Sequence, residues 1–149
     1  MKKIHLVMIV MLLMTSQVIA ELTRNDSNET VTDSLTGLMW QDDSYAASVK
    51  KNWQGAIDYC ETLTLGGYND WLLPNKRELL SIADRSKSGP AIDNTFHNYS
   101  STYYVDYWSS TTDAGNSNNA WGVYFGDGGY SFNFLKSGTR YVRCVRPGQ

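Results

Sequence analysis

The sequence predicts an α+β domain in which two helices lie beside a twisted antiparallel sheet and one disulfide closes the fold. Two segments with helical spacing of apolar residues come early in the chain, and several short segments with alternating aromatic residues follow them. Only two cysteines are present, Cys60 and Cys144. Helices grouped ahead of a run of antiparallel strands are typical of the α+β class.

Residues 1–20 have the pattern of a secretory signal peptide. Lys2 and Lys3 precede an apolar run, and the segment ends at Ala20, a small residue suited to cleavage. A retained anchor is the alternative, but the run is shorter than the roughly 20 apolar residues of a spanning helix. We therefore expect an exported protein, periplasmic or extracellular, with no stable membrane insertion after signal cleavage. Residues 21–32 are polar and predict a flexible leader before one domain at 33–149.

Charge and cysteine content narrow the class of protein further. The chain has 13 Lys and Arg against 15 Asp and Glu, and two of the lysines lie in the signal segment. The remaining chain is acidic, which argues against nonspecific binding of nucleic acid. An oxidising compartment makes a bridge between Cys60 and Cys144 the first expectation. Reactive thiols are the alternative, but neither cysteine stands in a C-x-x-C motif or beside a histidine of the mature chain.

The first half of the domain contains a short strand and two helices. Leu38–Trp40 predicts a strand, and Asp42–Lys51 predicts a loop. Residues 52–65 predict a helix, since Asn52 can cap it and apolar residues recur every three or four positions. This apolar face consists of Trp53, Ala56, Ile57, Cys60 and Leu63.

The segment from Gly66 to Ile82 is the most informative stretch of the chain. A glycine turn precedes Trp71–Leu73, a short apolar strand, and Pro74 favours an extended Leu73. Asn75 and Glu78 have the spacing of a capping box, which predicts a second helix from Asn75 to Ala83.

The second half of the domain consists of strands and turns. Asp84–Thr102 predicts a long polar loop, and Asp113–Asn119 a shorter one. The expected strands are Tyr103–Ser109, Trp121–Phe125, Tyr130–Phe134 and Arg140–Arg146. The glycines between Gly126 and Gly129 predict a hairpin turn.

Three blocks of residues resemble a known family. They are Thr36–Gln41, then Gly67–Ile82, and then Tyr107–Thr111 followed by Trp121–Phe125 and Val142–Arg146. In this order they resemble the domain at the C-terminus of bacterial collagen-like adhesins. The resemblance implies an exported domain of C-type-lectin-like fold in which the cysteine of the first helix pairs with that of the last strand. Some relatives attach to sulfated polysaccharides and host surfaces.

The chain differs from that family and from lectins in two respects. It has no Gly-X-Y collagen stalk, so we expect a lone domain without stalk-based multivalency. It also lacks the Glu-Pro-Asn or Gln-Pro-Asp tripeptide with which many C-type lectins hold calcium and sugar together.

The sequence offers little for catalysis or for a cofactor. His97 is the only histidine after residue 20, and it lies in a polar stretch typical of a surface loop. We therefore expect no enzyme, no catalytic residue and no cofactor. Oxygen ligands suited to calcium occur in the later loops, but these residue types also form turns, and turns are favoured. They are Asp113, Asn116, Asn118, Asn119 and Asp127.

Aromatic side chains and polar loops favour a sugar-binding site. Aromatic faces can stack on sugar rings, although aromatic residues this dense also fill cores, as Trp108 and Trp121 are expected to do. The candidate ligand-binding residues are Tyr103, Tyr107, Tyr124, Tyr130, Asn116, Asn118, Asn119 and Asp127. Tyr124 is the strongest surface candidate because it alternates with the apolar positions of its strand.

Basic residues gather near the end of the chain. Lys136, Arg140, Arg143 and Arg146 could hold a sulfated ligand, but alternation divides them between two faces, and a solvated strand edge is favoured. The sequence thus predicts an exported, noncatalytic domain that binds a glycan or another cell-surface component. The alternative is an envelope protein–protein interaction module without sugar binding.

Overall fold

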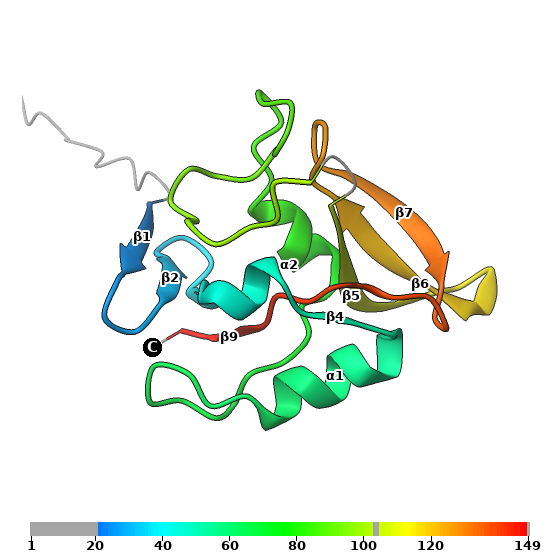
Figure 1. Ribbon diagram of the computed structural model, residues 1–149, viewed down its shortest axis with the longest axis horizontal. Coiled ribbons are helices and arrows are strands. Elements are labelled where there is room, and N and C mark those ends of the chain that lie inside the picture. The colour runs from blue at the N-terminus through cyan, green and yellow to red at the C-terminus, as the bar shows by residue number, and fades with distance from the viewer. Residues whose placement is uncertain (1–20, 103–104, 149) are drawn as a thin grey trace, which may run out of the picture.

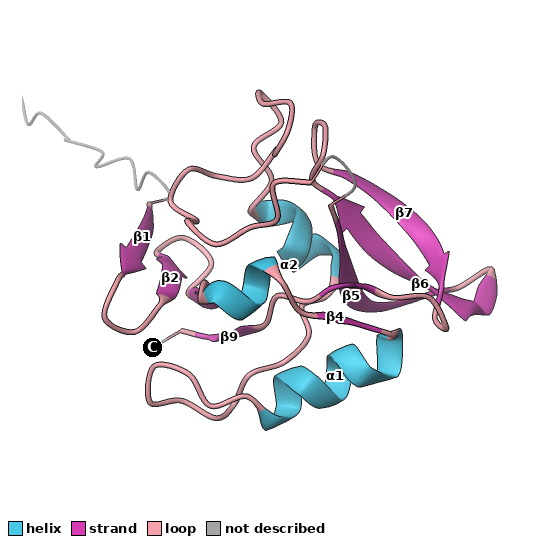
Figure 2. Cartoon of the chain, in the orientation of Figure 1, coloured by secondary structure: helices cyan, strands magenta, loops and turns pink. Residues whose placement is uncertain are grey.

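The residues that the structure describes form an α+β fold with two α-helices and two sheets (Figures 1 and 2). The computed structural model describes residues 21–102 and 105–148. The expected signal peptide at 1–20 and the candidate Tyr103 lie outside these ranges. In the described ranges, no helix has the length and apolar character needed to cross a membrane.

The first sheet joins the two ends of the domain. Its strands, in spatial order, are β1 (Leu22–Asn25), β2 (Thr30–Asp33), β3 (Leu38–Gln41) and β9 (Val145–Pro147). All neighbours are antiparallel, and Figure 1 shows the blue strands at the start of the chain on the same side as the red β9.

The prediction of a flexible leader at residues 21–32 is wrong. This segment forms β1 and most of β2, and Thr30 and Val31 are fully buried. Arg24 of β1 also lies 3.0 Å from the buried carboxylate of Asp42. The polar composition suggested a solvated leader because the partners of these residues lie elsewhere in the chain.

The second sheet carries most of the aromatic residues. Its spatial order is β4 (Lys50–Lys51), β8 (Arg140–Tyr141), β5 (Asp106–Asp113), β6 (Asn116–Tyr124) and β7 (Tyr130–Leu135). Strands β5, β6 and β7 form an antiparallel meander, and β7 is an edge strand. The expected loop at Asp113–Asn119 is shorter than predicted, because β6 already begins at Asn116.

Both predicted helices form, with the predicted caps. In α1 (Trp53–Thr62) the side chain of Asn52 accepts a hydrogen bond from the Gly55 amide, and the helix ends three residues before the predicted Leu65. In α2 (Lys76–Ser81) Asn75 and Glu78 form the full capping box. The expected loop at Asp42–Lys51 contains a short 3₁₀ helix, Ser44–Ala47, and strand β4.

The predicted final strand is divided between the two sheets. Residues 142–144 carry the chain from β8 in the second sheet to β9 in the first. Cys144 lies in this crossing and forms the predicted disulfide with Cys60 of α1, with a Cα–Cα distance of 5.5 Å. The bridge therefore fixes α1 to the point where the two sheets meet.

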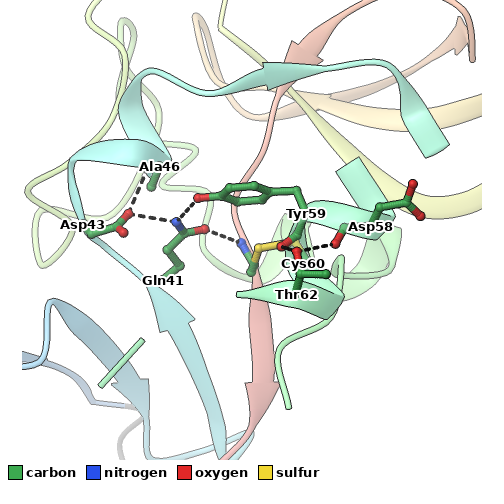
Figure 3. Close-up of a disulfide and its surroundings, with 8 residues drawn as sticks. Gln41, Asp43, Ala46, Asp58, Tyr59, Cys60 and Thr62 are labelled. Carbon is green, nitrogen blue, oxygen red and sulfur yellow. Dashed lines mark hydrogen bonds between the residues drawn. A yellow bond between two sulfur atoms is a disulfide. The ribbon is translucent and has the colours of Figure 1, made fainter. Parts of the chain in front are cut away.

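A buried glutamine supports the disulfide from β3 (Figure 3). The side-chain nitrogen of Gln41 donates to Asp43 at 2.8 Å and to the Tyr59 hydroxyl at 3.0 Å, and its oxygen accepts from the Cys144 amide at 3.0 Å. Its side-chain nitrogen and oxygen therefore all have partners, as a fully buried amide requires. Burial is the largest influence on Tyr59 and raises the pKa of its hydroxyl.

Arg143 and Arg146 do not form the solvated edge that the sequence suggested. Arg143 is 1% exposed; it pairs with Asp42 at 3.1 Å and donates to the carbonyl oxygen of Asn98. Arg146 is 4% exposed and holds both carboxylate oxygens of Asp70, at 2.5 and 2.9 Å. Each guanidinium is thus committed to a structural ion pair.

Candidate functional site

One face of the second sheet is covered over only part of its length. Helix α1 packs there, and its Ala56 and Cys60 share a core cluster with Trp108 of β5 and Ala120 of β6. Helix α2 covers the opposite face, where Leu79 belongs to the other core cluster. Beyond the part covered by α1, the described residues include three aromatic side chains with accessible surface. We call them the open face: Tyr124, Tyr130 and Phe132.

Strand register places these aromatic residues side by side. Tyr124 of β6 lies directly opposite Tyr130 of β7 and also opposite Asp106 of β5. Residues directly opposite each other share a face of the sheet. Phe132 follows Tyr130 by two positions, so it lies on the same face. Tyr130 is 60% exposed and Phe132 is 50% exposed, whereas Tyr124 is partly buried.

Contacts between aromatic rings connect the open face to the core. The Tyr124 and Phe132 ring centroids are 6.4 Å apart in an edge-to-face arrangement, and Phe132 lies 6.5 Å from Phe134. Phe134 in turn meets the buried Trp108 ring at 6.0 Å. These separations lie within the range of favourable aromatic pairs. The open face is therefore attached to the core by a continuous series of rings.

Two glycines allow the rings to lie close to the backbone. A methyl group at Gly122 would come within 2.7 Å of the Tyr107 carbonyl oxygen and 3.0 Å of the Phe134 ring. A methyl group at Gly128 would come within 2.8 Å of the Tyr130 ring. The Tyr130 ring thus rests against the hairpin turn while most of its surface stays accessible.

A polar pocket of about 180 Å³ lies beside the open face. It is lined by Lys50, Asp106, Thr139, Arg140 and Tyr141. Arg140 Nε is 3.6 Å from the Asp106 carboxylate, and the Arg140 guanidinium carbon is 4.3 Å from the Phe134 ring centroid. Arg140 therefore connects the pocket to the aromatic series. Lys50 Nζ lies 4.3 Å from the Tyr141 ring centroid.

The Asp106 carboxyl is the acidic group of this pocket. Its partial burial raises its pKa, and the nearby charges of Arg140 and Lys50 oppose that shift. The pocket can accept hydrogen bonds at Asp106 and donate them from Arg140 and Lys50. With the aromatic surface beside it, the site suits a flat, partly apolar ring that carries hydroxyl groups.

The predicted tyrosines differ in their surroundings. Tyr124 and Tyr130 share the open face. Tyr107 is 1% exposed, and its hydroxyl donates to the Ala46 carbonyl, so it is a core residue and offers no surface to a ligand. Trp108 is fully buried as expected, whereas Trp121 is only partly buried and has Lys76 Nζ 3.9 Å from its ring centroid.

The predicted polar residues do not gather at the open face. Asn116, Asn118 and Asn119 lie at the start of β6, whereas Tyr124 ends that strand and Asp127 lies in the turn after it. The asparagines are thus at the opposite end of the strand from both Tyr124 and Asp127. In the described part of the chain, no three His, Cys, Asp or Glu side chains come together as a metal site.

Sequence reasoning missed the polar pocket and Phe132. Lys50, Asp106 and Arg140 come from three separate strands, and only the pairing of β4, β8 and β5 brings them together. Phe132 was assigned to the return strand, but its exposure could not be read from alternation alone. The alternation of Tyr130, Phe132 and Phe134 is a signal that these three side chains share one face of the strand.

His97 shows no catalytic surroundings. It is an exposed loop residue, and its backbone amide donates to the Asp42 carboxylate at 2.9 Å. Both cysteines are committed to the disulfide. The described residues therefore present neither a thiol nucleophile nor a histidine paired with one.

Comparison with known proteins gives the family. A family model described as the Lcl C-terminal domain matches residues 29–146, which include both helices, the second sheet and most of the first sheet. No curated protein matches the chain. The matched region includes the disulfide and the whole open face. The chain belongs to the Lcl C-terminal domain family, the family that the three sequence blocks resemble and that supplies the C-terminal domain of collagen-like adhesins.

Proposed function

We propose that this protein is an exported, noncatalytic binding domain that recognises a glycan on the open face. The observation that carries this proposal is the row formed by Asp106, Tyr124 and Tyr130, which adjoin one another across three strands. Aromatic residues bind the apolar faces of sugar rings, and a few convergent polar groups bind their hydroxyls. Membership of an adhesin-associated family supports the same role.

A sugar would bind with its ring against Tyr124 and Phe132. The Asp106 carboxylate would accept hydrogen bonds from hydroxyl groups, and Arg140 and Lys50 would donate hydrogen bonds to ring substituents. Recognition would need no calcium, because all of these groups bind a hydroxylated ring directly. Tyr130, at the outer strand, would contact the next sugar along a chain.

Export and the C-type-lectin-like fold are parts of the same proposal. The signal-like segment at residues 1–20 and the disulfide both suit an oxidising compartment, periplasmic or extracellular. The pairing of the first and last parts of the domain in one sheet supports the lectin-like fold.

A glycan array with the purified, oxidised protein tests the proposal. We expect specific hits that persist with chelator and that disappear in Phe132→Ala. The matched control is Leu135→Ala, which removes a side chain of similar exposure (61%) from the opposite face of the same strand. A blank array from folded protein, or equal loss in both variants, would contradict glycan recognition at this face.

A protein–protein module remains the second candidate because of a different surface. Two hollows of about 250 and 380 Å³ both include Leu72 and Pro147, and Leu72 is 51% exposed. If the array is blank, a stable complex with an envelope protein that Leu72→Ala disrupts would support this candidate.

A further inference from the structure

Strand β7 has no paired neighbour on its outer side among the described residues. It is the last strand in the order β4-β8-β5-β6-β7, and Figure 1 shows it along the outer margin of the fold. Three of the large apolar side chains most exposed among the described residues belong to this strand. They are Tyr130, Phe132 and Leu135. The edge therefore combines accessible apolar surface with accessible backbone.

The pattern of hydrogen bonds between β6 and β7 shows which backbone groups of β7 point away from the sheet. The Lys136 amide donates to the Asn118 carbonyl, and these two residues continue the β6–β7 register. Hydrogen-bonded pairs alternate along an antiparallel ladder. The backbone groups of Tyr130, Phe132 and Phe134 therefore point toward β6. Those of Ser131 and Asn133 point away from the sheet.

The edge lacks the features that normally prevent strand pairing. Natural edges carry charges, prolines or bulges, or are very short. Strand β7 reads Tyr-Ser-Phe-Asn-Phe-Leu, and its six pairs with β6 are in unbroken register. By contrast, the opposite edge β4 has only two residues, Lys50 and Lys51, both exposed. The edge strand β1 of the first sheet has four residues and includes Arg24.

We propose that β7 pairs with β7 of a second copy of this chain, antiparallel and across a two-fold axis. In such an interface the residue at the axis meets its own copy, and the residues beside it meet their near neighbours of the other copy, so a charged strand would repel itself. Strand β7 has no charged residue and satisfies this condition, whereas β4 does not. This proposal does not depend on glycan binding.

The free backbone groups favour one register. The Leu135 carbonyl already accepts from the Gly138 amide, so the available pairs are Ser131 with the second copy's Asn133 and the reverse. Phe132 then lies at the axis opposite its own copy, in a non-hydrogen-bonded pair where side chains are closest. Tyr130 lies opposite the second copy's Phe134. The aromatic surfaces of the two copies become continuous on one face.

The dimer closes on itself. After pairing, the two outer edges of the joined sheet are both β4, and their exposed lysines oppose further addition of strands. We therefore expect a discrete dimer and no filament.

Substitution of Phe132 by residues of opposite charge tests this interface. Sedimentation of the purified, oxidised protein across a concentration series should show a monomer–dimer equilibrium. Phe132→Lys and Phe132→Glu should each weaken association at least about tenfold, since like charges then meet at the axis. An equimolar mixture of the two variants should form a heterodimer. The matched control, Tyr45→Lys, changes an aromatic residue of similar exposure (59%) outside β7 and should dimerise as the unmodified chain does.

Two results would overturn the proposal. One is a monomeric unmodified chain up to its solubility limit. The other is any departure from the expected behaviour of the Phe132 variants while each is folded by circular dichroism. Either both variants still dimerise as tightly as the unmodified chain, or their mixture forms no heterodimer. Because these measurements contain no glycan, their failure is distinguishable from a blank glycan array.

Discussion

Asp106 is the residue whose protonation should control the proposed binding site. Partial burial raises its pKa, with Arg140 and Lys50 opposing the shift. Only the ionised carboxylate accepts hydrogen bonds at both oxygens. Binding should therefore be complete well above the raised pKa and decline as the pH falls through it.

We predict that glycan affinity falls as the pH drops, with a midpoint above the ordinary pKa of an aspartate carboxyl, because burial raises the pKa of Asp106. The measurement is calorimetric titration of an array-derived glycan between neutral and acidic pH. Asp106→Asn should bind more weakly at neutral pH and lose this pH dependence. If Asp106→Asn keeps the pH profile of the unmodified protein, the Asp106 carboxylate does not take part in binding.

At the scale of the element, β6 depends on a residue that has no side chain. Gly122 lies between the Tyr107 carbonyl and the Phe134 ring, with no space for a methyl group. We predict that Gly122→Ala lowers the free energy of unfolding by roughly 1–3 kcal/mol, the usual cost of overpacking. Urea denaturation measures the change.

Gly115→Ala is the matched control for this substitution. Its added methyl group would meet only the Asp113 side chain, at an ordinary contact distance of 3.6 Å. Its effect should lie within about 0.5 kcal/mol, as for most surface changes. Equal effects at the two glycines would show that the Phe134 ring is not held against β6 as described.

The elements also show what local sequence patterns can predict. The capping box of Asn75 and Glu78 and the apolar face of α1 depend on neighbours within a few residues, and both were predicted correctly. The structure of residues 21–32 was not predicted correctly, because the burial of Val31 depends on strands β1 and β3 on either side of β2. Pairing across the sheet, rather than composition, decides that segment.

At the scale of the whole molecule, the disulfide fixes the crossing between the two sheets. Cys60 and Cys144 are 84 positions apart, and they were paired correctly from the sequence because no other cysteine is present. Removing the bridge with Cys60→Ser and Cys144→Ser should lower the free energy of unfolding by roughly 4–5 kcal/mol on the chain-entropy model. Urea denaturation of the double variant, compared with the oxidised protein, measures this loss. A loss below about 1 kcal/mol would show that the crossing is held without the bridge.

Long-range contacts explain why only part of the site was predictable. Arg143 pairs with Asp42, 101 positions away in sequence, so the prediction that Arg143 lies on a solvated edge was wrong. Alternation predicted correctly that Tyr124 lies on the face of β6 opposite the buried Val123, but it could not show that Tyr107 is buried. The polar pocket required the order of three strands, which no local pattern contains.

The most direct test of glycan recognition at the open face is NMR of the amide, aromatic and aliphatic resonances of the protein during titration with an array-derived glycan. Concentration-dependent shifts are expected at Asp106, Tyr124, Tyr130 and Phe132, with none at Leu72 or Pro147. Shifts confined to Leu72 and Pro147, where the two hollows meet, would show that the glycan does not bind at the open face.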